Sequence, residues 1–394
     1  MRQLDAKLSA VRGGDDLTHP NPAYFRRLDR FCAMAAERGL VVMWALIWGG
    51  DRPTLPAARF TTEQAVQFAR YAVTRLGAFP AVWSLSGDAL YVSDYETWET
   101  VGAAIEECDP YAHATTIHLS PTANWYALFH QSGWHDFHML QTGHRRASAV
   151  DIRDLPQLYN RLSALKPVLN GEPSSEQTPA VDALPAPPKP VVNGEPWYEA
   201  HPATDVQGQY GPIFSPYDAR YAFWVSLLSG ATMGHTYGSQ GIWNWKRPGD
   251  SEEHFAGPQI GPVWTTALDH DGARQCGLGA KLVQTLPWWQ LQPAPERVQL
   301  DPSAARDVAR PVCAVVLGQL WIAYQPTGGG RLILKGIEPG AWRARWFDPR
   351  TGAEQPVGPV EVDRNLKWTA PLPPTQDDWV LIVTSEISEH HAEE

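Results

Sequence analysis

The sequence contains few cysteines and no long hydrophobic segment. Its four cysteines, Cys32, Cys108, Cys276 and Cys313, lie far apart without a Cys-x-x-Cys spacing, which argues against a disulfide framework and a zinc ribbon. We therefore expect buried thiols that pack as small apolar side chains. The longest apolar run, LVVMWALIW at 40–48, is far shorter than the roughly 20 residues that a membrane-spanning helix needs. We expect a soluble protein without a membrane partner.

Clusters of basic residues and an N-terminal secretion signal are also missing. The formal charge is −11, from 32 Lys and Arg against 43 Asp and Glu, and no basic stripe offers a surface for nucleic acid. The first 16 residues hold no apolar stretch behind their basic residue, so the expected location is the cytoplasm. We expect a small neutral molecule as the partner, and the sequence does not indicate an oligomeric state.

The sequence is rich in aromatic residues, and its expected strands and helices alternate along the chain. The 18 Trp and 13 Tyr suit both a large core and a sugar-binding surface, since aromatic faces stack on the C–H faces of sugars. Asn21 and Pro22 begin a first helix, Gly39 ends it, and Thr61 with Gln64 forms a capping box for a second. The expected strands are 40–48, 81–88, 114–120, 137–144, 189–196 and 231–243, and further helices are expected at 95–108, 216–229 and 263–286.

This alternation predicts an α/β fold. Strands that alternate with helices form right-handed βαβ units and a parallel sheet, so we predict a (β/α)8 TIM-type barrel in 1–286. Only six strands can be assigned, because 1–16 has neither the length nor the apolar content for the two that should precede Asn21. The expected barrel therefore lacks its first two strands and is open, with unpaired edges that promote aggregation.

The composition and the hydrophobic pattern of the sequence change after residue 286. The Pro-rich stretch 287–311 is interpreted as a connector and the charged stretch 387–394 as a disordered tail. Between them, 312–386 consists of short apolar runs separated by Gly and Pro turns, which is typical of a small antiparallel β-sandwich domain. We expect this domain to pack on the barrel.

Polar and aromatic residues follow all six expected strands. In a parallel α/β barrel the chemistry sits at the carboxyl ends of the strands. Each residue alone could be a helix cap or a satisfied buried group, but together they predict a site. The residues at these ends are Trp48, Asp88, His118, Gln141, His144, Glu195, His235, Tyr237 and Trp243.

Two carboxylates in this set, Asp88 and Glu195, each follow an apolar strand and a glycine. Glycoside hydrolysis needs such a pair, one to protonate the leaving oxygen and one to attack or to activate water. The motif Lys-Pro-Val-x-Asn-Gly-Glu-Pro, however, occurs twice, so Glu172 competes with Glu195. The first copy continues into a Pro-rich stretch, about 173–190, that we interpret as an inserted surface loop.

Several motifs together resemble the apiosidase-like family, glycoside hydrolase family 140 and its relatives. They are NPAYFRRLDRFCAMAAERGLVVMWALIWGG, AVWSLSGD, NGEPWYE, GHTYGSQGIWNW and WFDPRTG, and the resemblance covers about 17–385. It implies a (β/α)8 barrel followed by a small β-sandwich that carries the historical label of a collagen-binding domain. It also implies retaining hydrolysis of a plant cell-wall-type oligosaccharide without a cofactor.

The resemblance also implies roles for single residues. Asp88 matches the family's acid/base aspartate, although Ser86 stands where the family often has glycine. Glu195 matches the nucleophile, because only the second copy continues into Trp197 and Tyr198, which we add to the substrate-binding residues. Glu172 becomes the less favoured candidate.

Two other interpretations stay open. His135, Asp136, His138 and His144 could suggest a metal, but strand alternation should send His135 and His138 to opposite faces, and we predict no metal site. A non-catalytic carbohydrate-binding protein, or an inactive truncated fragment, is the alternative to an enzyme. The sugar, the linkage and the effect of the missing strands on activity are not indicated by the sequence.

Overall fold

The computed structural model describes most of the chain, and its compact part divides in two. The described residues are 19–48, 60–87, 95–118, 129–161, 189–205, 207–250, 253–254, 257–258, 261–303 and 307–386. Unit 1 comprises Met1–Gln141 and Arg161–Pro190, and unit 2 comprises Thr142–Asn160 and Val191–Glu394. Asp88, Glu172, the stretch 1–16 and the tail 387–394 lie outside the described residues.

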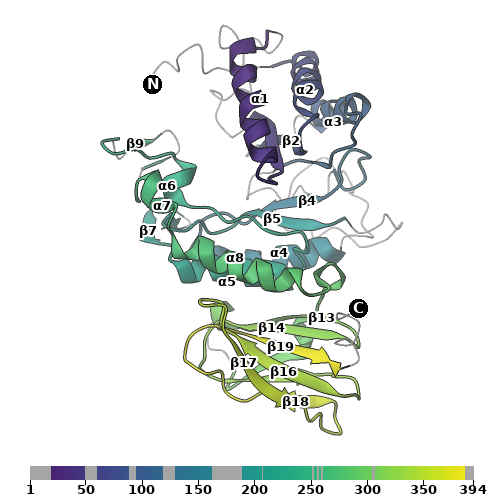
Figure 1. Cartoon of the computed structure of the whole chain (residues 1–394), viewed down its shortest axis with the longest axis vertical. Coiled ribbons are helices and arrows are strands. Elements are labelled where there is room, and N and C mark those ends of the chain that lie inside the picture. Colours follow the sequence, from purple (N-terminus) through teal and green to yellow (C-terminus); the bar gives the residue numbers. More distant parts are fainter. Residues whose placement is uncertain are drawn as a thin grey trace. The chain divides into compact units, whose positions relative to one another are not determined.

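The described residues of unit 1 form a parallel sheet and three helices, which are labelled in part in Figure 1. The strands β1 and β2 pair in register from Val42↔Ala81 to Trp48↔Gly87, and an isolated parallel bridge joins His118 to Met139. The sheet consists of β1 (Val42–Trp48), β2 (Ala81–Gly87) and β3 (Thr115–Thr116), and β4 (His138–Gln141) is a further strand of the unit. The helices are α1 (Pro22–Ala36), α2 (Thr62–Leu76) and α3 (Tyr95–Cys108).

Local side-chain hydrogen bonds begin the first two helices as predicted. The Asn21 side chain accepts from the backbone N–H of Ala23 at 3.1 Å. The Gln64 N–H donates to Thr61 Oγ1 at 3.3 Å, and the Thr61 N–H donates back to Gln64 Oε1 at 3.1 Å. Both arrangements satisfy N–H groups that a helix leaves unpaired in its first turn.

The α/β part of unit 2 is built around two parallel strands, β5 (Val191–Glu195) and β8 (Gly234–His235). Its other strands are β6 (Pro202–Thr204), β7 (Tyr210–Ile213), β9 (Glu253–His254) and β10 (Gly257–Pro258). Its helices are α4 (Ala149–Arg161), α5 (Pro216–Leu228), α6 (Gln240–Trp243), α7 (Trp264–Ala267) and α8 (Asp271–Gln284).

Three predictions for this region were wrong or incomplete. Only Gly234–His235 of the expected strand 231–243 forms a strand, β8, and the chain continues into the short helix α6 at Gln240. The expected helix 263–286 is split into α7 and α8. The helix α4 was not predicted, since Pro156 lies inside it.

The C-terminal part of unit 2 is the predicted antiparallel β domain. One sheet has the order β11-β13-β14-β19-β16-β17 and the other β12-β15-β18. The first consists of β11 (Gln292–Pro293), β13 (Val312–Val316), β14 (Leu320–Gln325), β16 (Trp342–Phe347), β17 (Glu354–Pro359) and β19 (Trp379–Ser385). The second consists of β12 (Val298–Asp301), β15 (Arg331–Lys335) and β18 (Lys367–Thr369).

The interpretation of 287–311 as a connector needs correction. The strand β11 pairs with β13, and β12 pairs with β15 through Val298↔Leu334 and its neighbours. The segment is therefore part of both sheets. Its prolines are compatible with this role because both strands lie at sheet edges, where a missing N–H costs little.

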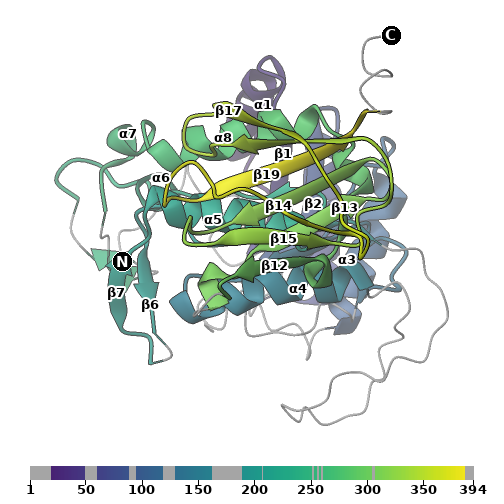
Figure 2. The same cartoon turned by 90° about the horizontal axis from the view of Figure 1, so that it is seen from below.

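Alternating residues of the larger sheet serve two cores. In β14, Leu320, Ile322 and Tyr324 face a core shared with α5 and α8, whereas Trp321 and Ala323 face the second sheet. Because both faces are covered, the strand is apolar throughout. Figures 1 and 2 show α5 and α8 running across the sheet that contains β13, β14 and β19. The expectation that the sandwich packs on the α/β part is confirmed within unit 2.

Unit 1 also contains a buried cluster of His130, His135 and His138 beside Lys189. The His130 Nδ1 and His138 Nε2 atoms are 2.9 Å apart, and the rings of His135 and His138 meet at 4.9 Å. The prediction that His135 and His138 point to opposite faces was wrong, because β4 begins only at His138. Among the described residues, no group of three or more His, Cys, Asp or Glu side chains could hold a metal ion.

We expect this cluster to make the protein sensitive to acid. Burial, followed by the neighbouring His130 and Lys189, lowers the pKa of His138 to about 3. The folded state keeps His138 neutral while the unfolded state takes up a proton below its ordinary pKa of about 6.5, so the contribution to stability is complete above that pH and is lost towards pH 3. At about pH 5 the loss from His138 alone is about 2 kcal/mol.

Denaturant unfolding at about pH 7.5 and about pH 5 measures this effect. His138→Gln should reduce the difference between the two free energies of unfolding, whereas substitution of the exposed His19 by Gln should leave it as in the original protein. An unchanged pH difference in His138→Gln would contradict the assignment.

Candidate active site

In unit 1, two predicted residues, Trp48 and His118, lie side by side, one at the end of β1 and the other after β3. The rings of Trp48, at the end of β1, and His118 lie 6.1 Å apart. A Cβ atom on Gly87, the last residue of β2, would lie 2.3 Å from the Trp48 ring, so this close approach requires glycine. Asp88 follows Gly87 in the sequence but lies outside the described residues. Gln141 ends β4 and is buried.

In unit 2, the central residue is Glu195 at the end of β5. The Gly143 N–H donates to the Glu195 carbonyl at 2.9 Å, and on the other side of the strand the Thr236 N–H donates to the Asn193 carbonyl at 2.9 Å. Glu195 Oε1 is 3.2 Å from His144 Nε2, and both side chains are 15% exposed. A strand bonded along both edges thus holds a carboxylate that is partly open to solvent.

Aromatic rings pack around His144. Its ring lies 4.6 Å from Tyr198 and 4.0 Å from His201, nearly parallel to the latter. Burial, and then the proximity of His144, lowers the pKa of His201 to about 3, so His201 is a neutral ring at ordinary pH and its Nδ1–H donates to the Pro202 carbonyl at 2.8 Å. The neutral ring fixes the orientation of His144 without adding charge beside Glu195.

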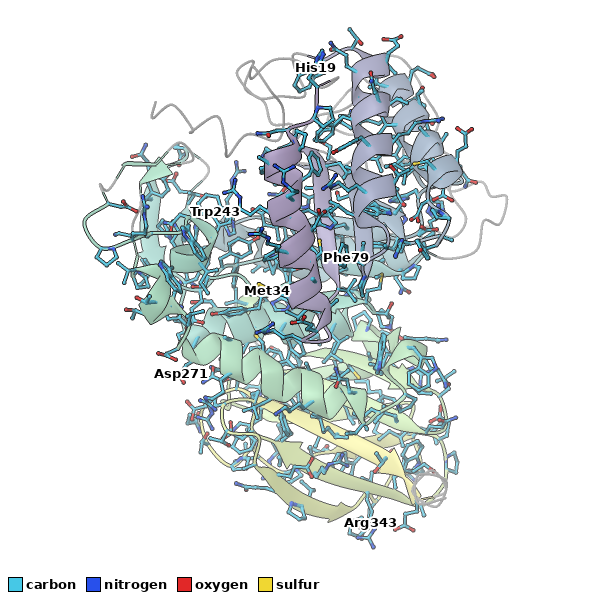
Figure 3. The ribbon with its side chains drawn as sticks, turned by 45° about the horizontal axis from the view of Figure 1, so that its top comes forward. His19, Met34, Phe79, Trp243, Asp271 and Arg343 are labelled. Carbon is cyan, nitrogen blue, oxygen red and sulfur yellow. The ribbon has the colours of Figure 1, made fainter. Side chains whose placement is uncertain are left out.

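Trp243 extends this group outwards. Its ring lies 6.2 Å from His201, and 46% of the residue is exposed. Figure 3 shows Trp243 beside the short helices of unit 2 and Asp271 at the start of α8. The structure therefore brings together four predicted residues, Glu195, His144, Tyr198 and Trp243.

A second carboxylate, Glu199, lies four residues after Glu195 and is buried. It accepts from the Tyr237 hydroxyl at 2.6 Å and from the Gly272 N–H in the first turn of α8 at 3.3 Å. Burial and the bond to Glu199 raise the pKa of Tyr237 far above its ordinary value of 10. Tyr237 was predicted to bind substrate, but its hydroxyl binds Glu199 and ties the segment after β8 to the segment after β5.

Two other predicted residues, Trp197 and His235, make packing contacts within unit 2. Trp197 is buried in the core, stacks on Phe214 at 5.1 Å, and donates through Nε1 to the Arg145 carbonyl at 2.9 Å. His235 packs edge-on against Phe223 of α5, where burial lowers its pKa to about 4. Both side chains serve the packing between the sheet and its helices.

His201 and Glu199 were not predicted as functional residues. Glu199 closes the motif Asn-Gly-Glu-Pro-Trp-Tyr-Glu, and His201 lies six residues after Glu195. The available signal was their position in the segment after a strand end, where barrel enzymes carry their chemistry. Their distinct roles, a buried anchor and a packing ring, depend on contacts that the local sequence does not contain.

A family model described as "Apiosidase-like, catalytic domain" matches residues 3–290, which is more than half of the chain. The chain belongs to the apiosidase-like family. It is a glycoside hydrolase, and the match includes the strands of unit 1, the strands β5 to β10 of unit 2 and Glu195. A second model, described as "Putative collagen-binding domain of a collagenase", matches residues 304–384 of this apiosidase-like protein and covers most of its β domain.

Solved glycoside hydrolase structures share the fold of this apiosidase-like chain. One titled "Glycoside hydrolase" matches at a TM-score of 0.75 and 21% identity, covering 98% of this chain and 81% of the other. A glycoside hydrolase family 5 protein from Bacteroides vulgatus matches at a TM-score of 0.74 and 22% identity, covering 92% and 74%. At these identities the likeness concerns the fold alone.

Comparison with curated protein sequences finds no match. Among the described residues, none of the helices combines the length and apolar character that crossing a membrane requires.

Proposed function

We propose that this apiosidase-like protein hydrolyses a glycosidic bond with retention of configuration, with Glu195 as the nucleophile and Asp88 as the general acid and base. The observation that supports Glu195 is its position at the carboxyl end of β5 with Oε1 at 3.2 Å from His144 Nε2. His144 Nδ1 meets no partner among the described residues, which favours the tautomer that carries its proton on Nε2. That proton is donated to the carboxylate and fixes its plane.

The chemistry follows from the two carboxylates. Asp88 protonates the leaving oxygen while a Glu195 oxygen attacks the anomeric carbon and forms a covalent glycosyl ester. Asp88 then takes a proton from water, which displaces Glu195 and restores the original configuration. The parallel strands in each unit and the shared fold support a (β/α)8 barrel, in which both residues follow strand ends.

For the substrate we propose a plant cell-wall-type oligosaccharide. The matching family is described as apiosidase-like, and the exposed Trp48 and Trp243 offer faces on which sugar rings can stack. Trp48 is 41% exposed in unit 1 and Trp243 is 46% exposed in unit 2.

The test is hydrolysis of a panel of aryl glycosides that includes an apioside and an arabinofuranoside. The first product detected by NMR should have the anomeric configuration of the substrate. A 2-fluoro glycoside of the active substrate should label the peptide that contains Glu195. An initial product of inverted configuration would overturn the retaining mechanism, and glycan binding without any hydrolysis would favour the non-catalytic interpretation.

A further inference from the structure

Two tryptophans of unit 2 form an exposed stacked pair outside the group around Glu195. The rings of Trp245 and Trp264 lie 4.9 Å apart with an angle of 4° between their planes. Trp264 is half-buried and Trp245 is 58% exposed, so one indole supports the other from below. A contiguous exposed apolar surface of this kind is a candidate ligand-binding site.

The backbone holds Trp245 in place. Trp245 adopts a left-handed φ of 51°, a costly conformation for a bulky residue and one that tends to occur at functional sites. Its N–H donates to the Ile242 carbonyl at 3.1 Å, and the Trp264 N–H donates to the Lys246 carbonyl at 2.8 Å. The exposed indole is therefore preorganised, which lowers the entropy lost on binding.

A chain of side-chain contacts leads from the candidate nucleophile to the last residue of α6, and the pair begins shortly after that helix. Glu195 contacts His144, His144 stacks on His201, and His201 meets the ring of Trp243. Trp245 lies two residues beyond Trp243, immediately after α6. All of these residues belong to unit 2.

The groups next to the pair favour an uncharged ligand. The Lys246 ammonium donates to the Gly261 carbonyl at 3.0 Å, and Arg247 pairs with Asp250 at 3.4 Å. The face of an indole carries negative charge density and attracts the weakly positive C–H bonds on one side of a sugar ring. A flat, fixed and exposed indole thus suits a neutral sugar.

We propose that Trp245, supported by Trp264, is a platform that binds a neutral sugar ring of the substrate beyond the sugar that reacts at Glu195. This inference rests on the proposed function, because it takes the ligand to be an oligosaccharide. The platform extends recognition from the single glycosidic bond to a longer chain.

The test uses the full chain with Glu195→Gln, so that oligosaccharides released enzymatically from plant cell-wall pectin and arabinoxylan bind without being cleaved. In this background Trp245→Asn removes the indole while keeping a residue that tolerates the left-handed backbone. Trp245→Tyr retains an aromatic face. Trp289, which is 64% exposed in unit 2 outside this pair, provides the matched control Trp289→Ala.

We expect Trp245→Asn to raise the Kd, measured by calorimetry, by roughly 10-fold, because the burial of an aromatic face against a sugar contributes binding free energy on that scale. Trp245→Tyr should recover most of the affinity, and Trp289→Ala should bind as the parent does. Equal losses in Trp245→Asn and Trp289→Ala, no loss in either, or no binding by the parent would overturn the platform.

Aryl-glycoside hydrolysis by the protein with Glu195 intact is measured separately, so that the two proposals can fail independently. If nothing is hydrolysed but binding still depends on Trp245, the platform stands and the proposed function fails. If hydrolysis proceeds and binding does not depend on Trp245, only the platform fails.

Discussion

Glu195→Ala is expected to lower kcat on the best aryl glycoside by about 10⁴-fold or more, because it removes the atom that forms the covalent intermediate. The variant also loses the hydrogen bond between His144 Nε2 and Glu195 Oε1, which are 3.2 Å apart, because the carboxylate is absent. The measurement is steady-state hydrolysis with an activated leaving group. The far-UV spectrum and thermal unfolding of the variant should match those of the original protein, since the Glu195 side chain is not part of the buried core.

A matched control lies in the other copy of the repeated motif. Glu172→Ala should retain full activity if the second copy is the catalytic one. Added azide should restore turnover of Glu195→Ala and give a glycosyl azide of inverted configuration, because azide enters on the face that the carboxylate occupied. Loss of activity in Glu172→Ala with activity kept in Glu195→Ala would reverse the assignment.

Arg220→Met is expected to lower the free energy of unfolding of unit 2 by about 3–5 kcal/mol, because it leaves a buried carboxylate unpaired. Arg220 of α5 binds Asp378 of the β domain through two hydrogen bonds, of 2.7 and 3.0 Å, and also donates to Gln275 of α8. Tyr324 adds a hydroxyl donor to Asp378 at 3.1 Å. The side chains of Arg220 and Asp378 are 7% and 1% exposed.

Denaturant unfolding followed by tryptophan fluorescence measures this loss, and a surface ion pair provides the control. Arg343 and Glu386 lie 2.8 Å apart but are 57% and 43% exposed, so Arg343→Met should cost less than about 1 kcal/mol; Arg343 is labelled in Figure 3. Combining Arg220→Met with Asp378→Leu should recover part of the loss, because no charge then remains buried. Equal effects of Arg220→Met and Arg343→Met would refute the importance of the buried pair.

Much of the local structure was evident from the sequence alone. Caps at Asn21 and Thr61, the apolar run of β1 and the limits of α3 depend on residues close in the chain, and the structure has them as predicted. The position of Glu195 at a strand end likewise follows from the apolar run before it. Such features are set by interactions within one helix or strand, and a single sequence contains all the residues involved.

The sequence by itself therefore determined the family, the secondary structure of most segments and the carboxylate that ends β5. Only the tertiary structure decided which of two similar residues faces solvent. Trp197 and Trp243 both follow strands, yet Trp197 stacks on Phe214 in the core whereas Trp243 remains 46% exposed. The tertiary structure likewise shows that the Tyr237 hydroxyl donates to Glu199, a residue 38 positions earlier in the sequence. Burial depends on partners far away in the chain, and no local pattern contains them.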